Sequence, residues 1–350
     1  MSQSTHVLFC MGNPLLDISV NADTTLLKKY DLKANDSILA EEKHKPLYEE
    51  LINNYTPAYV AGGATQNTAR GAQYLLPPNS VIYFGCVGSD QYADQMRKAA
   101  GKEGLTVDYL VDNEHPTGTC AVVITDLNRS LVANLSAAEQ YKDSKHLDLP
   151  GKWKIVENAK YYYIGGFFLT VSPSAILKVA RHAAENNKPF MMNLSAPFLC
   201  QAPPFKKVMS DVLPYWDIIF GNESEAEAFA VSENWKTTDL KEIALKIAQL
   251  PKVNTKRPRV VIITHGAQPT VVAYQETGKV VEIPTCPIAD KDIVDTNGAG
   301  DSFVGGFLSQ YITGKSIEES VKVGHWLANH TIRLDGPTYP EEKLTYPGSS

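Results

Sequence analysis

The sequence contains Asp295-Thr296-Asn297-Gly298-Ala299-Gly300-Asp301, a glycine-rich stretch that runs directly into an apolar stripe. The stripe consists of Phe303, Phe307, Leu308 and Tyr311 at helical spacing, and Gly314 follows as a helix stop. A glycine-rich loop is therefore expected to open into a helix. The glycines let backbone N–H groups converge, and the helix dipole adds positive potential. The pattern predicts an anion hole suited to a transferring phosphoryl group.

Asp301 falls in the first turn of that expected helix. A carboxylate beside an anion hole would repel phosphate, so its presence needs a chemical reason. General-base chemistry supplies one, because a carboxylate can accept the proton of a hydroxyl that attacks the γ-phosphorus. The alternative is a glycine turn with a helix-capping Asp, which this stretch alone leaves open.

Length and composition narrow the class of protein. A chain of 350 residues suggests about two units, and a net charge of −6 argues against partners such as nucleic acid or anionic membrane. The five cysteines are widely spaced without a C-x-x-C motif, which indicates reduced thiols. The first residues do not resemble a signal peptide, and no apolar stretch reaches membrane-span length. We expect a monomer in the cytoplasm, with the nucleus as a further compartment.

Apolar runs alternate with helical stretches through most of the chain. Helices are expected at 174–186 and 239–249, and a charged amphipathic helix at 41–55. The expected strands span 7–11, 81–87, 119–125, 161–164, 190–194, 217–220 and 260–264. This alternation predicts a mostly parallel sheet with helices on both faces. The later strands end in polar or small residues, and ligands bind outside the carboxyl ends of such strands.

Two segments differ from this pattern. The apolar runs 119–125 and 130–135 are separated by Asp126-Leu127-Asn128-Arg129, which predicts a hairpin with Arg129 in its turn. We expect residues 16–60 and 117–137 to form a small β-rich lid. The large α/β domain would then comprise residues 1–15, 61–116 and 138–350.

Further motifs accompany the glycine-rich stretch in a fixed order. Together with Phe303-Val304-Gly305-Gly306 and Ala61-Gly62-Gly63-Ala64-Thr65-Gln66-Asn67, it resembles the two signatures of the ribokinase-like (PfkB) carbohydrate and nucleoside kinases. The resemblance extends from about residue 6 to residue 340. The other matching segments are 12–17, 117–120, 128–131, 166–173, 194–198 and 221–225. Within the family, these motifs are most similar to those of members that phosphorylate adenosine.

The resemblance implies a three-layer α/β/α sandwich with a small lid, and an enzyme that moves a phosphoryl group from ATP to the 5′-hydroxyl of adenosine with Mg²⁺. Asp301 would be the base. Gly298, Ala299 and Gly300 would form the anion hole, and Arg129 would reach the phosphates, which suits a planar and permanently charged guanidinium. A solvated turn arginine is the alternative for Arg129.

The resemblance also implies residues that hold the nucleoside. Asp17 and Asn67 look like ribose ligands, since a carboxylate accepts two hydrogen bonds from a vicinal diol and an amide both donates and accepts. Gly62 and Gly63 would let the backbone approach the ribose, although an ordinary turn is the alternative. The further substrate positions are Asn13, Leu15, Leu39, Cys120, Leu131, Ala133, Phe168 and Phe198. For the apolar ones among these, core packing is as good an interpretation.

A last group of residues is expected near ATP and the metal. Asn222 and Glu225 resemble an N-x-x-E element that organises Mg²⁺ through water, which is sensible because magnesium takes few protein ligands. Helix capping by Asn222 is the alternative. The remaining ATP-site residues implied by the resemblance are Thr264, Gly266, Asn297 and His325, and for His325 a buried helical histidine is equally reasonable.

Some features depart from the family pattern or separate the rival functions. Ser302 follows the base where Ala is usual, and Ser37 replaces a longer polar side chain of some relatives. There is no G-x-x-x-x-G-K-[ST] loop, which excludes a Walker-type site. The alternatives are a sugar or other nucleoside kinase of this family and a non-catalytic nucleoside-binding regulator. A dehydrogenase is the weakest, because no G-x-G-x-x-G follows the first strand.

Overall fold

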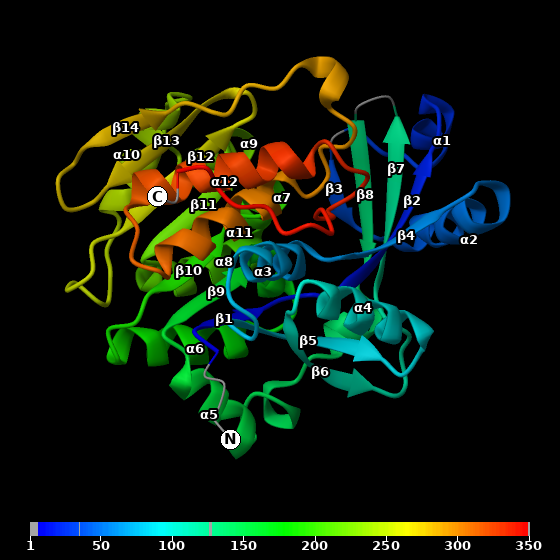
Figure 1. The fold of residues 1–350 in the computed structure, drawn as a ribbon, viewed down its shortest axis with the longest axis horizontal. Helices are drawn as coiled ribbons and strands as arrows, with labels where there is room; N and C mark the ends of the chain where they lie inside the picture. Colours follow the sequence, from blue (N-terminus) through cyan, green and yellow to red (C-terminus); the bar gives the residue numbers. More distant parts are fainter. Residues whose placement is uncertain (1–5, 35, 126–127, 349–350) are drawn as a thin grey trace.

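The computed structural model describes residues 6–34, 36–125 and 128–348, and its strands form two sheets (Figure 1). The larger sheet has nine strands in the order β14-β13-β12-β11-β10-β9-β1-β5-β6. Their bounds are β1 Leu8–Met11, β5 Val81–Gly88, β6 Thr106–Asp112, β9 Tyr161–Gly165, β10 Phe190–Asn193, β11 Ile218–Asn222, β12 Val260–His265, β13 Gln268–Tyr274 and β14 Val280–Ile283. Neighbours from β12 to β6 pair in parallel, whereas β13 and β14 pair antiparallel.

Helices cover both faces of the large sheet, as the sequence predicts. Side chains alternate between the faces of a strand, so Phe9 and Met11 of β1 join one core cluster while Leu8 and Cys10 join the other. The first face carries α5 Pro150–Asn158, α6 Pro173–Glu185, α7 Pro197–Gln201, α8 Pro203–Val212, α9 Glu223–Ser232 and α10 Leu240–Gln249. The second carries α3 Ala64–Leu75, α4 Gln91–Lys102, α11 Ala299–Tyr311 and α12 Ile317–Thr331. The fold is therefore a three-layer sandwich of the ribokinase-like kind.

The second sheet has five strands in the order β3-β8-β7-β2-β4 and lies beside the sandwich (right in Figure 1). Its strands are β2 Leu15–Asn21, β3 Ser37–Leu39, β4 Ala58–Gly62, β7 Thr119–Thr125 and β8 Asn128–Asn134. α1 Thr24–Lys29 and α2 Lys45–Asn54 bury one face through residues such as Leu27 and Leu51. The strands fall within the segments expected to form a lid except for Leu15 of β2 and the last two residues of β4, Ala61 and Gly62, and the lid itself stays a prediction.

The chain passes between the two sheets at four places: β1 to β2, β4 to α3, β6 to β7, and β8 to the 3₁₀ turn Ser136–Gln140. Hydrogen bonds join these passages. Leu15 pairs with Gly62 in the β2–β4 ladder, the N–H of Leu16 donates to Gly118 O (2.9 Å), and the N–H of Ala137 donates to Pro116 O (3.0 Å). The passages therefore form one packed boundary.

The expected hairpin differs in one detail. β7 and β8 are antiparallel, and their ladder includes Thr125 opposite Asn128 and Ile124 opposite Arg129. Arg129 therefore lies on a strand and not in the turn, because the ladder extends further than the apolar pattern indicates. The turn residues Asp126 and Leu127 lie outside the described residues.

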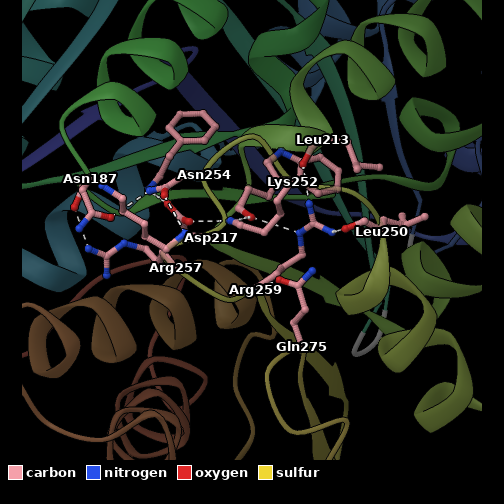
Figure 2. Close-up of polar contacts among 12 residues, drawn as sticks. Asn187, Leu213, Asp217, Leu250, Lys252, Asn254, Arg257, Arg259 and Gln275 are labelled. Atoms are coloured by element: carbon pink, nitrogen blue, oxygen red, sulfur yellow. Dashed lines mark hydrogen bonds and ion pairs between the residues drawn. The ribbon is translucent and has the colours of Figure 1, made fainter.

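A buried charged cluster lies at the amino ends of the strands of the large sheet (Figure 2). Arg259, fully buried, precedes β12, and Asp217 precedes β11, so both lie at the amino ends of their strands. Asp217 pairs with Lys252 at 2.6 Å. The Arg259 guanidinium donates to the carbonyls of Leu213, Trp216, Ile247, Leu250 and Pro251. The bonds to Ile247 and Leu250 satisfy carbonyls at the end of α10.

Candidate active site

A cleft opens between the carboxyl ends of the large sheet and the uncovered face of the small sheet. Its volume is about 670 Å³ when the space open to solvent at its mouth is included. Of the residues predicted to bind substrate or nucleotide, the cleft is lined by Asn13, Leu15, Asp17, Leu39, Gly63, Asn67, Cys120, Leu131, Ala133, Asn297 and Asp301. The cleft thus brings together segments that lie far apart in the sequence.

The glycine-rich loop ends at the start of α11. Gly298 is the N-cap residue with a φ of +74°, a left-handed conformation that favours glycine. The N–H of Ser302 donates to Gly298 O (2.8 Å) and begins the helix, while the N–H of Ala299 donates to Thr296 O (3.2 Å). By helix geometry, the N–H groups of Gly300 and Asp301 point out of the helix start. A Cβ on Gly300 would meet no atom within 4 Å, so the space before this turn is open.

Asp301 is half-buried and lines the floor of the cleft. Its Oδ2 accepts a hydrogen bond of 3.0 Å from Asn67 Nδ2. Burial raises the pKa of the Asp301 carboxyl from 3.8 to about 7, because a charge is costly away from water, while the bond from Asn67 acts in the opposite direction. A carboxyl with such a pKa exchanges protons near neutral pH, which is what a general base requires.

Asp17 lies on β2 in the same cleft and is 5 % exposed. Burial and then the charge of Asp301 raise the pKa of its carboxyl to about 7. A Cβ on Gly62 would lie 2.3 Å from Asp17 Oδ1, so a larger residue at position 62 would displace this carboxylate. Asn13 donates through Nδ2 to Phe167 O (3.3 Å).

Two buried side-chain oxygens in this cleft have no hydrogen-bond partner within the described part of the chain: Oδ1 of Asn13 and Oδ1 of Asn67. Buried acceptors are normally satisfied, and an unmade bond costs roughly 1–3 kcal/mol. Together with the carboxylates of Asp17 and Asp301, these two oxygens make one end of the cleft rich in hydrogen-bond acceptors. A ligand rich in hydroxyl donors fits that end.

The other end of the cleft is apolar. Leu15, Cys120 and Leu135 belong to the core cluster on the uncovered face of the small sheet, and Leu39, Leu131 and Ala133 pack against it. This face therefore offers a hydrophobic wall to a ligand.

The aromatic prediction needs a correction at Phe168. This side chain is 1 % exposed and packs against Tyr141 in the core, with ring centroids 5.4 Å apart. Its neighbour Phe167 lines the cleft instead, because the two residues point in different directions from the 3₁₀ helix Gly166–Thr170. The ring centroids of Phe198 and Phe167 lie 6.3 Å apart, and Phe198 is not among the residues that line the cleft.

Arg129 is bonded to the glycine-rich segment. Its Nε donates to Asp295 Oδ1 at 2.6 Å, and both side chains are buried. Asp295 also accepts from the N–H groups of Asn297 (2.7 Å) and Gly336 (3.0 Å). The carboxylate of Asp295 thus connects β8 of the small sheet to the loop that precedes α11. This ion pair could not be predicted from the sequence, because its two residues belong to different motifs.

A smaller hollow lies beside the main cleft, at the ends of β10, β11 and β12. Its lining includes Asn222, Glu225, Thr264 and Gly300. It is adjacent to the glycine-rich loop and therefore suited to the phosphates of a second ligand.

Asn222 and Glu225 form the capping box of α9. Glu225 Oε2 accepts from the N–H of Asn222 (3.0 Å) and Oε1 accepts from Asn222 Nδ2 (3.0 Å), while the N–H of Glu225 donates to Asn222 Oδ1 (2.9 Å). Burial raises the pKa of Glu225 to about 7. Within the ranges that the structure describes, no group of three His, Cys, Asp or Glu side chains is arranged to hold a metal ion.

The other residues predicted near ATP lie as follows. The hydroxyl of Thr264 donates to Gly221 O (3.3 Å) in the smaller hollow. Gly266 follows β12 with open space around it. His325 on α12 is 8 % exposed and lies outside both hollows; its ring is tilted against that of Phe303, with centroids 5.0 Å apart. Burial lowers the pKa of His325 to about 4, which supports the buried-helix interpretation.

Comparisons with known proteins agree with this geometry. A model of the pfkB family of carbohydrate kinases matches residues 24–344. The chain is 51 % identical over 337 residues to adenosine kinase 2 of Arabidopsis thaliana, covering 96 % of each chain. It is 48 % identical over 346 residues to adenosine kinase of Schizosaccharomyces pombe, covering 98 % of this chain and 99 % of the relative.

Solved structures resemble the whole chain as well. Anopheles gambiae adenosine kinase in complex with P1,P4-di(adenosine-5) tetraphosphate superposes with a TM-score of 0.91 at 46 % identity, covering 93 % of this chain and 95 % of that one. Schistosoma mansoni adenosine kinase in complex with 2-fluoroadenosine has a TM-score of 0.92 at 36 % identity, covering 96 % and 98 %.

Proposed function

The chain belongs to the pfkB family of carbohydrate kinases, and from this premise we propose that it is an ATP:adenosine 5′-phosphotransferase that forms AMP and ADP. The relatives named adenosine kinase are similar over nearly the full length, which favours adenosine over another sugar or nucleoside as acceptor.

One observation carries the proposal: the cleft has an acceptor-rich end and an apolar end. The vicinal hydroxyls of a ribose match Asp17 and the unpartnered oxygens of Asn13 and Asn67. An adenine ring matches the wall built by residues such as Leu39 and Leu131. A bare sugar would leave that wall uncovered, and for a pure binding protein a base with a pKa near 7 at the cleft floor would serve no purpose.

In the proposed reaction, the 5′-hydroxyl lies between Asp301 and the N-terminus of α11. Asp301 accepts the proton as the oxygen attacks the γ-phosphorus of ATP. The outward N–H groups of the first helical turn stabilise the charge that develops on the transferring phosphoryl group. Arg129 can add to this stabilisation if it moves from Asp295 toward the phosphates. Closure of the small sheet over the cleft would exclude water and so suppress hydrolysis of ATP.

Mg²⁺ fits this site in an outer-shell arrangement. The Glu225 carboxylate is already engaged by Asn222, so a directly bound metal would have to break the capping box. Magnesium keeps several waters, and Glu225 is placed beside the hollow where it can accept from them. When bound with ATP, the metal would neutralise phosphate charge.

We also propose a cytoplasmic enzyme that acts as a monomer. The five cysteines are free thiols, as expected in a reducing compartment. In the ranges that the structure describes, none of the helices has the length and apolar character needed to span a membrane.

A substrate panel tests the proposal. ADP release is measured with adenosine, inosine, guanosine and ribose side by side, and product AMP is confirmed by chromatography. Adenosine should be preferred in kcat/KM, and Asp301→Asn should abolish most of the release. Preference for ribose would identify a sugar kinase, and adenosine binding without ADP release would identify a regulator.

A further inference from the structure

Asn67 is bonded through both its backbone and its side chain. It lies in the first turns of α3 and is 3 % exposed. Its backbone N–H donates to Gly63 O (2.9 Å), and its backbone carbonyl accepts from the hydroxyl of Tyr339 (3.2 Å). That hydroxyl also lies 3.1 Å from Ser302 Oγ, next to Asp301 in the chain. The backbone of Asn67 is therefore fixed relative to the start of α11.

The side chain of Asn67 faces Asp301. Nδ2 donates to Asp301 Oδ2 at 3.0 Å, across 234 positions of sequence. The amide cannot be turned over without cost, because Oδ1 would then face the carboxylate. A donor fixed in this way favours one rotamer of the carboxylate and favours its charged form.

We propose that Asn67 is a positioning residue for Asp301, which holds the carboxylate ionised and aimed into the cleft. The inference rests on the proposed role of Asp301 as general base and adds a role for Asn67 beyond contact with the ribose.

The other ionisable groups around Asp301 do not favour its charge. Asp17 on β2, Glu225 on α9, Tyr163 on β9 and Tyr339 after α12 each interact electrostatically with it. All four are acids, so when ionised each would repel the carboxylate. Besides the helix N-terminus, the N–H of Asn67 is the side-chain contact that opposes the effect of burial, and its loss should raise the pKa of Asp301.

The second polar atom of the amide connects this role to the substrate. Oδ1 of Asn67 is buried at the cleft without a hydrogen-bond partner in the described ranges. It is free to accept from a substrate hydroxyl while Nδ2 stays on Asp301. One rigid side chain would then orient both the base and the group beside it.

The decisive experiment measures Asp301 without turnover. The protein is labelled with ¹³C at the aspartate carboxyls, and the Asp301 resonance is identified by its absence in Asp301→Asn. Asn67→Leu removes the donor at nearly constant volume. Loss of this donor should raise the Asp301 pKa by about one to two pH units, since a hydrogen bond to a charged group contributes roughly 1.5–3 kcal/mol. Asn67→Ser, too short to reach Asp301, gives the same expectation if the leucine variant does not fold.

Gln73→Leu is the matched control. Gln73 is a buried amide on the same helix that bonds Pro77 O (2.8 Å) and the N–H of Val81 (2.9 Å), away from the cleft. It should lower stability and leave the Asp301 pKa unchanged. An unchanged Asp301 pKa in both Asn67 variants would overturn the inference.

Kinetics then separate the inference from the proposed function. The acidic limb of kcat/KM against pH should move upward in Asn67→Leu by the same amount as the measured pKa, with partial recovery of activity at high pH. A shifted pKa with an unmoved acidic limb would support Asn67 as the residue that holds Asp301, but would remove Asp301 from the role of base.

Discussion

At the scale of single residues, the proposed mechanism assigns the proton transfer to Asp301, a carboxylate whose pKa is raised by burial. Asp301→Asn keeps the shape of the side chain and can still accept from Asn67. It cannot take the substrate proton, so kcat should fall by roughly 10²–10⁴-fold while ATP affinity is retained. Steady-state kinetics with a nucleotide-binding titration checks this, and near-normal turnover would exclude the assigned role.

Asp17 should decide how strictly the enzyme requires a complete ribose. If Asp17 accepts from the 2′- and 3′-hydroxyls, the wild type should disfavour 2′- and 3′-deoxyadenosine by about ten- to a hundredfold in kcat/KM, because a bond to a charged group contributes roughly 1.5–3 kcal/mol. Asp17→Ala should lower adenosine activity and also shrink this preference. Equal losses on all three substrates would instead indicate a structural role.

At the scale of elements, steady-state kinetics can test the contact between β8 and the glycine-rich loop. Arg129→Ala should lower kcat much more than it raises the adenosine KM, because the guanidinium is assigned to charge that develops during transfer. It also leaves the buried Asp295 without its ion-pair partner, which should cost stability by about 3–5 kcal/mol. Asp295→Asn in the same background should restore part of that stability without restoring kcat.

The start of α9 offers a second test at this scale. Glu225→Gln can keep the shape of the capping box but loses the charge that would order metal-bound water. The Mg²⁺ concentration for half-maximal activity should rise, with a loss of about 10–100-fold in metal affinity or activity. Mg²⁺–ATP affinity measured by calorimetry gives a readout independent of turnover. An unchanged titration would leave Glu225 as a helix cap only.

Much of the element-level picture followed from the sequence, and the failures have physical causes. The glycine-rich loop, its helix and six strands of the large sheet (β1, β5, β9, β10, β11 and β12) are set by local periodicity and turn chemistry, so they were predictable. The strands β6, β13 and β14 were not among those expected. Phe168 and Phe167 are neighbours of one type, and only the path of a 3₁₀ helix decides which one faces the cleft. The bonds from Asn67 to Asp301 and from Arg129 to Asp295 join distant segments, which no local pattern encodes.

At the scale of the whole molecule, the active site should lower stability at neutral pH. Burial raises the pKa of Asp301 from 3.8 in the ordinary state to about 7 in the folded one. Between these values the folded state binds a proton that the unfolded state lacks, so stability falls as pH rises from about 4 to about 7. Asp301→Asn should therefore have a Tm about 2–6 °C above wild type at pH 8, with a gap that closes toward pH 4.

Thermal unfolding of the ligand-free protein across this pH range provides the measurement. Asp23→Asn is the control, because Asp23 is an exposed helix cap whose pKa is lowered by its bonds to Thr25. Asp23→Asn should show no rise in Tm over wild type at pH 8. A higher Tm for Asp301→Asn at every pH would point to better packing and not to a relieved charge.

The four chain passages between the sheets have a mechanical consequence. A domain on a single linker can swing and twist in any direction, whereas four short tethers cross-bonded to one another resist torsion and shear. The motion that they resist least is a hinge bend of the small sheet about the boundary that they form. The small sheet should therefore move in one direction only. The distances between spin labels on α2 and α12 should shift in that single direction when ligands bind.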